Sequence, residues 1–290
     1  MTAQGPPPAT TVVIPVWGDH ARERVGDALA SVGAQDREVA VVLVDNAAEP
    51  PVEPVPGVRL LRSEARLTLG GARNLGLAHA VTEYVIFWDA DDRMLPGTVR
   101  FLEARMEASR NLVAFGSAIV EEPSGRRHRW PRPWLRILVR LPALLGLLDA
   151  VWSEFPTTGA TLLRADAVRA AGGFADADSG EDWCLGAALV WRGRCGWSER
   201  PGRVYVQRPD STWPTHASGR HQWRHAAAVR ARLREAGVAP SWLRHLLPAI
   251  AAAQWGAIAA HVLLAGVRAR RHMRGRPARE APRAGPGPCV

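Results

Sequence analysis

Three carboxylates follow directly on a strand-like run of the chain. Residues 84–88, with the sequence YVIFW, are aromatic or β-branched, and such residues favour a buried strand. The next four residues, DADD, supply Asp89, Asp91 and Asp92. Carboxylate oxygens are the ligands that Mg²⁺ and Mn²⁺ prefer, and these ions commonly bridge a carboxylate to substrate phosphates. The pattern predicts a metal site at Asp89 and Asp91, whereas Asp92 could equally cap a helix that begins near residue 95.

Strands and helices alternate along the chain before this cluster. Strand-like apolar runs occur at residues 11–17, 38–47 and 58–63. A glycine-led helix is expected over 70–82, directly before the run that ends in the carboxylates. Such alternation predicts a mostly parallel sheet with helices on its faces, in which ligands gather at the carboxyl ends of the strands. Asp45 and Asp89 both follow strands and are therefore expected at the same edge of the sheet.

The remainder of the sequence divides into segments of different character. Residues 1–10 form a proline-rich tail, and the α/β domain is expected to span 11–220. Residues 221–273 are predicted to form a helical C-terminal region with a contact to a membrane as one alternative. Residues 274–290 are rich in proline, glycine and arginine, which predicts a disordered basic tail.

Composition limits the classes of function. The chain has 290 residues and a net charge of +9, with no lysine, so its positive charge can attract phosphates or an anionic membrane face. The charge is dispersed and accompanies no recognised nucleic-acid module, which argues against nucleic-acid binding. Cys184, Cys195 and Cys289 show no CxxC spacing, and their odd number favours a reducing compartment. The first residues lack a secretory signal, so a cytoplasmic catalytic domain is expected.

Five motifs, taken in order, resemble those of the GT-A glycosyltransferases, in particular the large inverting family 2. They are VVIPVWG (12–18), VDNAAE (44–49), GGARNLGLAHA (70–80), FWDADD (87–92) and GGFADADSGEDWCLGAALVWRG (172–193). The resemblance implies a GT-A, Rossmann-like sheet and the transfer of a sugar from a nucleotide-diphosphate donor to an acceptor hydroxyl, with inversion. UDP is the favoured nucleotide, and GDP or dTDP remain alternatives. A role in making bacterial cell-envelope polysaccharide follows from the same resemblance.

The resemblance also implies a nucleotide-binding role for the ends of the first two strands. Pro15, Val16 and Trp17 would line the base. Asp45 would accept a hydrogen bond from the base, typically from uracil N3–H. The alternative for Asp45 is that its carboxylate caps a turn.

The next two motifs are implied to hold the diphosphate. Arg73 would contact the nucleotide or its diphosphate, and Asn74 would brace the loop. Asp89 would touch the ribose or the metal, and Asp91 would be the chief ligand of Mn²⁺ or Mg²⁺. Metal and diphosphate together would make the leaving group tolerable, by charge neutralisation at the bond that breaks. Alternatively, Arg73 could pair with a surface acid, and such exposed pairs contribute little.

The last motif contains the candidate base. An inverting transfer needs a group that takes the proton of the acceptor hydroxyl, and in the resembling family this is the Asp of an ED pair at a helix start. Asp182 is therefore predicted to be the base, and Glu181 to make acceptor or structural contacts. The alternative is that both acids only favour the helix N-terminus. Trp183 could pack on a sugar face or lie in the core.

One departure from the family pattern concerns the third metal ligand. Many relatives have a histidine after the final strand, in an R-x-H-x-G-S stretch, but this chain reads VQRPDSTWPTH. Arg208 and Ser211 match, whereas only Asp210 or His216 could replace the histidine. A catalytically inactive GT-A scaffold or nucleotide-binding subunit is thus the alternative function. A nucleotidyltransferase is disfavoured, because only one glycine closely follows the first strand.

Two apolar segments raise the question of a membrane. Residues 246–267 are about as long as a membrane span, which takes ~20 residues, but Gln254 and His261 favour a buried or interfacial helix. Residues 134–148 mix arginine and leucine and could lie on a membrane surface or cover the acceptor cleft. A lipid-linked or polysaccharide acceptor, and a location at the inner face of the cell membrane, fit both segments.

Overall fold

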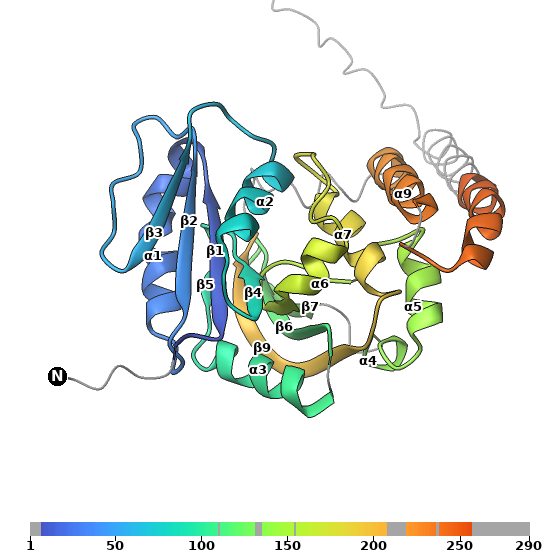
Figure 1. Ribbon diagram of the computed structural model, residues 1–290, viewed down its shortest axis with the longest axis horizontal. Helices are drawn as coiled ribbons and strands as arrows, with labels where there is room; N and C mark the ends of the chain where they lie inside the picture. The colour runs from blue at the N-terminus through green and yellow to red at the C-terminus, as the bar shows by residue number, and fades with distance from the viewer. Residues whose placement is uncertain are drawn as a thin grey trace, which may run out of the picture.

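The computed structural model describes residues 7–109, 111–130, 135–153, 155–207, 219–235 and 238–256. The strands in these ranges are β1 (Thr10–Val16), β2 (Ala40–Asn46), β3 (Val58–Ser63), β4 (Tyr84–Phe87), β5 (Arg93–Met94), β6 (Val113–Glu121), β7 (Arg127–Trp130), β8 (Thr161–Arg164) and β9 (Cys195–Val206). They form one curled sheet in the order β3-β2-β1-β4-β8-β6-β9-β5, and β7 pairs with β6 (Figure 1). The predicted α/β class is therefore confirmed.

The first four strands in space are parallel, as their apolar runs predict. β1 pairs with β2 and β4, and β2 pairs with β3, all in parallel register. Alternate residues face opposite sides of the sheet, so Val13 joins one core cluster whereas Val12 and Ile14 join the other. The carboxyl ends of β1, β2 and β4 consequently meet at one edge.

Helices cover both faces of the sheet. They are α1 (Gly18–Gly33), α2 (Leu69–His79), α3 (Thr98–Ser109), α4 (Leu135–Leu138), α5 (Pro142–Asp149), α6 (Ala165–Ala170), α7 (Glu181–Leu189), α9 (Gly219–Arg234) and a last helix at 241–256. α1 and α3 pack on one face, and α2, α6 and α7 on the other. The layer that contains α2, α6 and α7 is extended by α5, α9 and helix 241–256. These three helices lie on the side of the molecule away from β1, β2 and β3 (Figure 1).

β9 pairs irregularly with β6. It begins at Cys195 and runs parallel to β6, with register shifts between Phe115 and Ala118. Pro201 and Gly202 argue against a regular strand at this point. The register shifts accommodate Pro201 and Gly202, because residues at a β-bulge do not take part in the regular hydrogen bonds between the two strands.

Several predictions concern segments that lie wholly or partly outside the described residues. These include the 274–290 tail, Arg208 and its neighbours Asp210, Ser211 and His216, and residues 257–267 of the apolar stretch. Within the described ranges, none of the helices combines the length and apolar character that crossing a membrane requires. The proposed domain boundaries stay a prediction.

The close contact between α2 and β1 depends on a glycine. A Cβ atom placed on Gly76 would lie 2.2 Å from Val13 Cγ1. We expect Gly76→Ala to lower the free energy of unfolding by about 1–3 kcal/mol through overpacking, as measured by urea denaturation. Gly26→Ala, in open space on α1, is the matched control and should be neutral or stabilising. Equal effects of the two substitutions would show that α2 does not pack this closely.

Candidate active site

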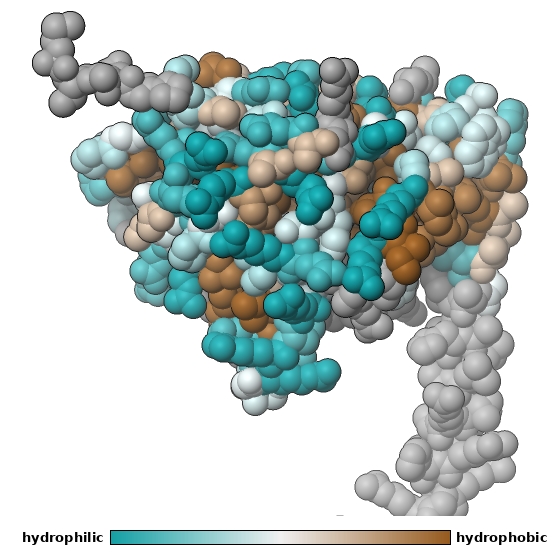
Figure 2. Space-filling view, turned by 90° about the horizontal axis from the view of Figure 1, so that it is seen from below, coloured by the Kyte–Doolittle hydropathy of each residue, from teal (hydrophilic) through white to brown (hydrophobic). Residues whose placement is uncertain are grey.

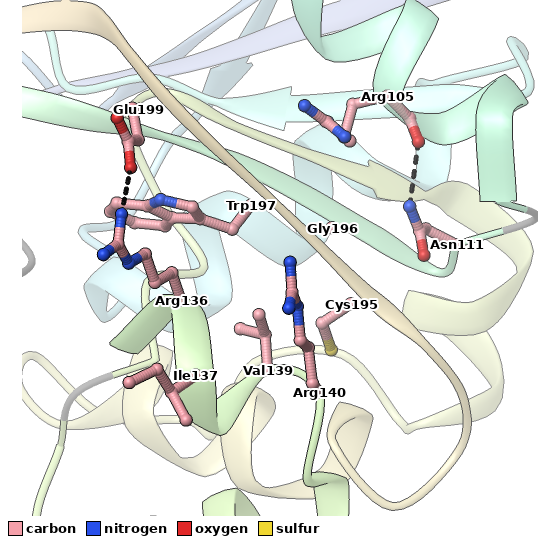
Figure 3. A pocket seen from close by; sticks show the side chains of 10 residues that line it. All are labelled: Arg105, Asn111, Arg136, Ile137, Val139, Arg140, Cys195, Gly196, Trp197 and Glu199. Carbon is pink, nitrogen blue, oxygen red and sulfur yellow. Dashed lines mark hydrogen bonds and ion pairs between the residues drawn. The ribbon is translucent and has the colours of Figure 1, made fainter. Parts of the chain in front are cut away.

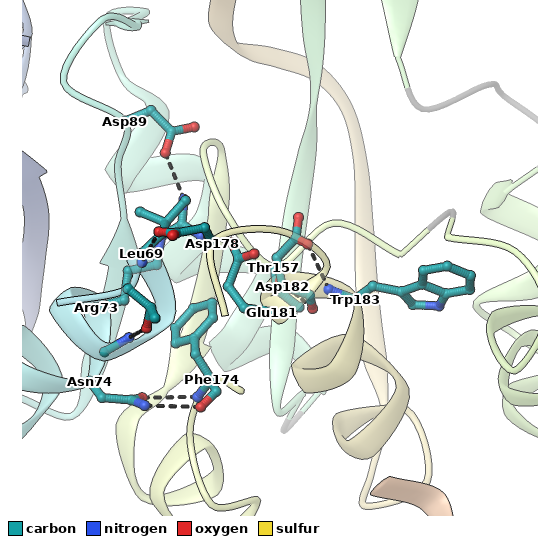
Figure 4. A network of polar contacts seen from close by, with 12 residues as sticks. Leu69, Arg73, Asn74, Asp89, Thr157, Phe174, Asp178, Glu181, Asp182 and Trp183 are labelled. Atoms are coloured by element: carbon teal, nitrogen blue, oxygen red, sulfur yellow. Dashed lines mark hydrogen bonds and ion pairs between the residues drawn. The ribbon is translucent and has the colours of Figure 1, made fainter. Parts of the chain in front are cut away.

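Four segments that are distant in sequence converge at the carboxyl end of β4. Asp89 follows that strand, Arg73 comes from α2, Glu181 begins α7, and Arg203 lies on β9. Figure 4 shows Arg73 reaching from its helix toward Asp89, with Glu181 and Asp182 at the adjacent helix start. The sequence motifs that predicted a donor site and a base are therefore brought into one network of charges.

Arg73 is the centre of this network. Its Nη2 donates to Asp89 Oδ1 at 2.8 Å, and its Nη1 donates to Glu181 Oε1. The guanidinium also lies 5.3 Å from the ring centroid of Phe174, within the range of a cation–π contact. Burial alone would lower the pKa of Arg73, but the charges of Asp89, Glu181 and Asp182 more than offset this effect and raise it. Arg73 is thus a buried cation held by carboxylates.

Arg203 holds the carboxylate turn from the other side. Its Nη1 donates to Asp92 Oδ2 at 2.6 Å and lies 3.5 Å from Asp89 Oδ2. Gly159, at φ +71°, makes room for this arginine, because a Cβ there would lie 2.4 Å from Arg203 Nη1. Burial raises the pKa of Asp92 to about 7 even though Arg203 opposes the shift. Asp92 does not cap α3, because that helix begins only at Thr98, and the capping alternative is therefore excluded.

The loop before α7 is tied to α2 by hydrogen bonds. The Asn74 side chain donates to the carbonyl of Phe174 and accepts from its N–H, both at 2.9 Å. The N–H of Leu69 donates to Asp178 Oδ1, and the N–H of Gly70 donates to the carbonyl of Ala177. Asn74 therefore braces this loop, and these contacts fix the position at which α7 begins.

Glu181 and Asp182 differ in their surroundings. The Glu181 carboxylate is buried against Arg73, and burial and the neighbouring Asp182 raise its pKa to about 7. Asp182 is partly exposed; its Oδ1 accepts from the N–H of Trp183, and its carbonyl accepts from Thr157 Oγ1. Trp183 is buried, and its indole donates to the carbonyl of Asp149, away from Arg73 (Figure 4). Trp183 is therefore a core residue, and the alternative of sugar packing is wrong.

The predicted base-binding residues lie at the ends of β1 and β2. Pro15 and Val16 are buried, whereas Trp17 is 37% exposed at the start of α1. Asp45 is fully buried and accepts hydrogen bonds from Ala48 N–H, Val52 N–H and Arg62 Nη1. The Asp45 carboxylate therefore orders the loop after β2, as the turn-capping alternative describes, and its contact with a nucleotide base stays a prediction.

The candidate metal ligands sit on one turn. Asp91 has a 41% exposed side chain and lies 3.9 Å from Arg24, whereas Asp89 is shared between two arginines. The described part of the chain contains no group of three or more His, Cys, Asp or Glu residues that could hold a metal ion. Two carboxylates are nevertheless compatible with Mg²⁺ or Mn²⁺, because such ions take their remaining oxygens from phosphates and water.

Sequence reasoning missed the roles of Arg203 and Phe174. Arg203 stands in the strand sequence RVYV, and a charged residue inside a buried strand signals a buried partner. Its partner Asp92 lies 111 positions earlier in the chain, so no local pattern indicates which carboxylate it meets. Phe174 carries no such signal.

The parallel half of the sheet, β3-β2-β1-β4, places Asp45 and Asp89 at the carboxyl ends of β2 and β4. Residues 11–170, more than half of the chain, match Glycosyl transferase family 2. The protein therefore belongs to glycosyltransferase family 2 and is a glycosyltransferase. The matched region includes the FWDADD motif but ends before Glu181 and Asp182.

Solved structures show the same fold. TarS 1-349 from S. aureus in complex with UDP-GlcNAc shares 15% identity at a TM-score of 0.59, covering 78% of this chain and 67% of that one. The complex of the same fragment with UDP shares 15% identity at a TM-score of 0.53, covering 78% and 66%. A longer TarS structure also matches with 15% identity and a TM-score of 0.53, covering 77% of this chain and 43% of that one. No match was found among curated proteins.

The raised pKa of Glu181 predicts a pH-dependent stability. Between its usual 4.5 and its folded value of about 7, the folded chain keeps a proton that the unfolded chain has lost. The free energy of unfolding should therefore fall as pH rises through this window and level off above it. Glu181→Gln should reduce that fall by up to about 3 kcal/mol, as measured by urea denaturation at several pH values.

Asp92 contributes in the same direction, so a smaller slope remains in the Glu181→Gln variant. Glu53→Gln, at an exposed site, is the control and should leave the slope unchanged. An unchanged slope in Glu181→Gln would contradict the assignment of a buried, protonatable carboxylate to this position.

Proposed function

We propose that the enzyme transfers a sugar from a UDP-sugar to an acceptor hydroxyl with inversion, using Asp182 as the general base. The observation that carries this proposal is the Arg73 bridge, which links the carboxylates after β4 to the start of α7. The similarity to TarS structures that contain UDP-GlcNAc and UDP supports a UDP donor. The acceptor is expected to be lipid-linked or a polysaccharide.

Asp89 and Asp91 are the residues that would hold Mn²⁺ or Mg²⁺. When bound, the ion would stabilise the negative charge that develops on the departing diphosphate. Arg73 is almost fully enclosed by the protein and already neutralised by two carboxylates, so we assign it to positioning Asp89 rather than to a direct contact with phosphate. Trp17, the exposed member of its motif, is the best placed to contact the base.

The choice of base rests on the difference between the two acids of α7. Glu181 is buried and paired with Arg73, so it cannot approach an acceptor. Asp182 is partly exposed one position further on, and its backbone is held by Thr157. As the acceptor oxygen bonds to the anomeric carbon, its proton passes to the Asp182 carboxylate and the bond from that carbon to the diphosphate breaks on the opposite face.

Two substitutions test this proposal on purified protein. Asp182→Asn should lower the rate of UDP release from a UDP-sugar by about 10²–10⁴-fold, because a general base contributes about this much, while UDP with Mn²⁺ still raises the melting temperature. Ligand binding raises the melting temperature by mass action. In the wild type, EDTA should remove the metal-dependent part of the rise that UDP with Mn²⁺ causes, and Asp91→Ala should lack this part altogether.

Asp166→Asn, on the exposed start of α6, is the matched control and should behave as wild type in both assays. No thermal shift with any nucleotide would instead favour the inactive-scaffold alternative. Full activity in Asp182→Asn would remove Asp182 from the mechanism.

A further inference from the structure

An exposed apolar stripe runs along α4 and α5. Ile137, Leu141, Leu144 and Trp152 are 48 to 58% exposed. Ile137 lies on α4, Leu141 and Trp152 flank α5, and Leu144 lies on α5. Leu145 of the same helix is buried in the core, so the exposed stripe is additional to the face that anchors α5.

Helix 241–256 carries a second stripe of the same kind. Leu243 and Leu247 are buried, whereas Trp242, Leu246 and Trp255 are 44 to 53% exposed. Gln254 joins this helix to the end of α5, because its side chain donates to the carbonyl of Val151 at 2.9 Å. Figure 2 shows hydrophobic side chains gathered where α5 and this helix lie, with hydrophilic side chains beside them. Such a concentration of exposed apolar residues indicates an interaction surface.

A basic pocket adjoins the α4 end of this surface. It has a volume of about 740 Å³ and is lined in part by Arg105, Arg136 and Arg140. Arg136 pairs with Glu199 at 2.7 Å, whereas the guanidinium groups of Arg105 and Arg140 have no ion-pair partner among the residues that the structure describes. Figure 3 shows Arg105 and Arg140 approaching the pocket from α3 and from the turn after α4. The pocket is thus suited to an anion such as a phosphate.

The two segments that carry the exposed apolar residues are nearly free of acidic residues, and Glu199, which lines the pocket, is paired with Arg136. Residues 238–256 contain no acidic residue, and the only one in 135–149 is the buried Asp149. Four arginines follow between positions 268 and 274 of the sequence. Exposed tryptophans and leucines beside arginines are the composition of helices that lie in an anionic lipid interface. A protein partner would not require this combination of apolar stripes with a pocket in which Arg105 and Arg140 have no ion-pair partner among the described residues.

We propose that α4, α5 and helix 241–256 form a surface that binds an anionic lipid bilayer. The exposed leucine, isoleucine and tryptophan side chains enter the interface, and Arg105 and Arg140 take a lipid phosphate in the pocket beside the Arg136–Glu199 pair. The surface is built from residues outside the donor site, so binding to lipid does not depend on the proposed transfer reaction and is measured without it.

Vesicle flotation with the full chain tests this surface. Wild type should float with vesicles that contain phosphatidylglycerol and should not float with pure phosphatidylcholine. Arg105→Gln with Arg140→Gln should weaken binding by about 30-fold, since each arginine near an anionic surface contributes about fivefold. Ile137→Ser with Leu144→Ser should also weaken binding by at least about tenfold through lost apolar burial.

Matched controls carry the same changes elsewhere on the surface. Arg59→Gln with Arg126→Gln removes two exposed arginines, and Val81→Ser removes a side chain that is 89% exposed; both should bind as wild type. Failure of the wild type to float with phosphatidylglycerol would overturn the proposal. The wild type could instead form a dimer in analytical ultracentrifugation and not bind vesicles. If Ile137→Ser with Leu144→Ser then abolished the dimer, the surface would be a protein interface.

Discussion

The site depends on one buried cation. Arg73 leaves α2 and contacts carboxylates from two other segments, Asp89 after β4 and Glu181 at the start of α7. A buried guanidinium is tolerated only when carboxylates compensate it, and removing one partner of such a group is strongly destabilising. The bridge therefore fixes where α7 begins, and with it the position of Asp182 relative to the carboxylate turn.

A second arginine completes the arrangement. Arg203 on β9 pairs with Asp92 and approaches Asp89, so the turn after β4 is held from both sides. These two contacts use the inner carboxylates and leave the more exposed Asp91 at the surface of the turn. Burial still raises the pKa of Asp92, so the pairing with Arg203 offsets only part of the cost of keeping charge at the end of a buried strand. The parallel half of the sheet supplies the edge at which a donor could bind.

Much of this arrangement could be predicted from the sequence. The apolar runs that became β1, β2, β3 and β4 indicated a parallel sheet, and the order of the motifs indicated the family, both of which are confirmed. The pairing of Arg203 with Asp92 could not be predicted, because a contact between residues so far apart leaves no local pattern. The partners of the Asp45 carboxylate could not be predicted for a related reason, since the loop that it orders forms only in the folded chain.

A double-mutant cycle between Arg73 and Glu181 tests the central bridge most directly. Near pH 8, Arg73→Met alone should lower the free energy of unfolding by about 3–5 kcal/mol, because buried carboxylates lose their partner. The change that Glu181→Gln causes in the free energy of unfolding should then be more stabilising, by about 1–3 kcal/mol, in the Arg73→Met background than in the wild type. An equal effect of Glu181→Gln in both backgrounds would show that the two residues are not coupled, and would contradict the bridge on which this account of the site rests.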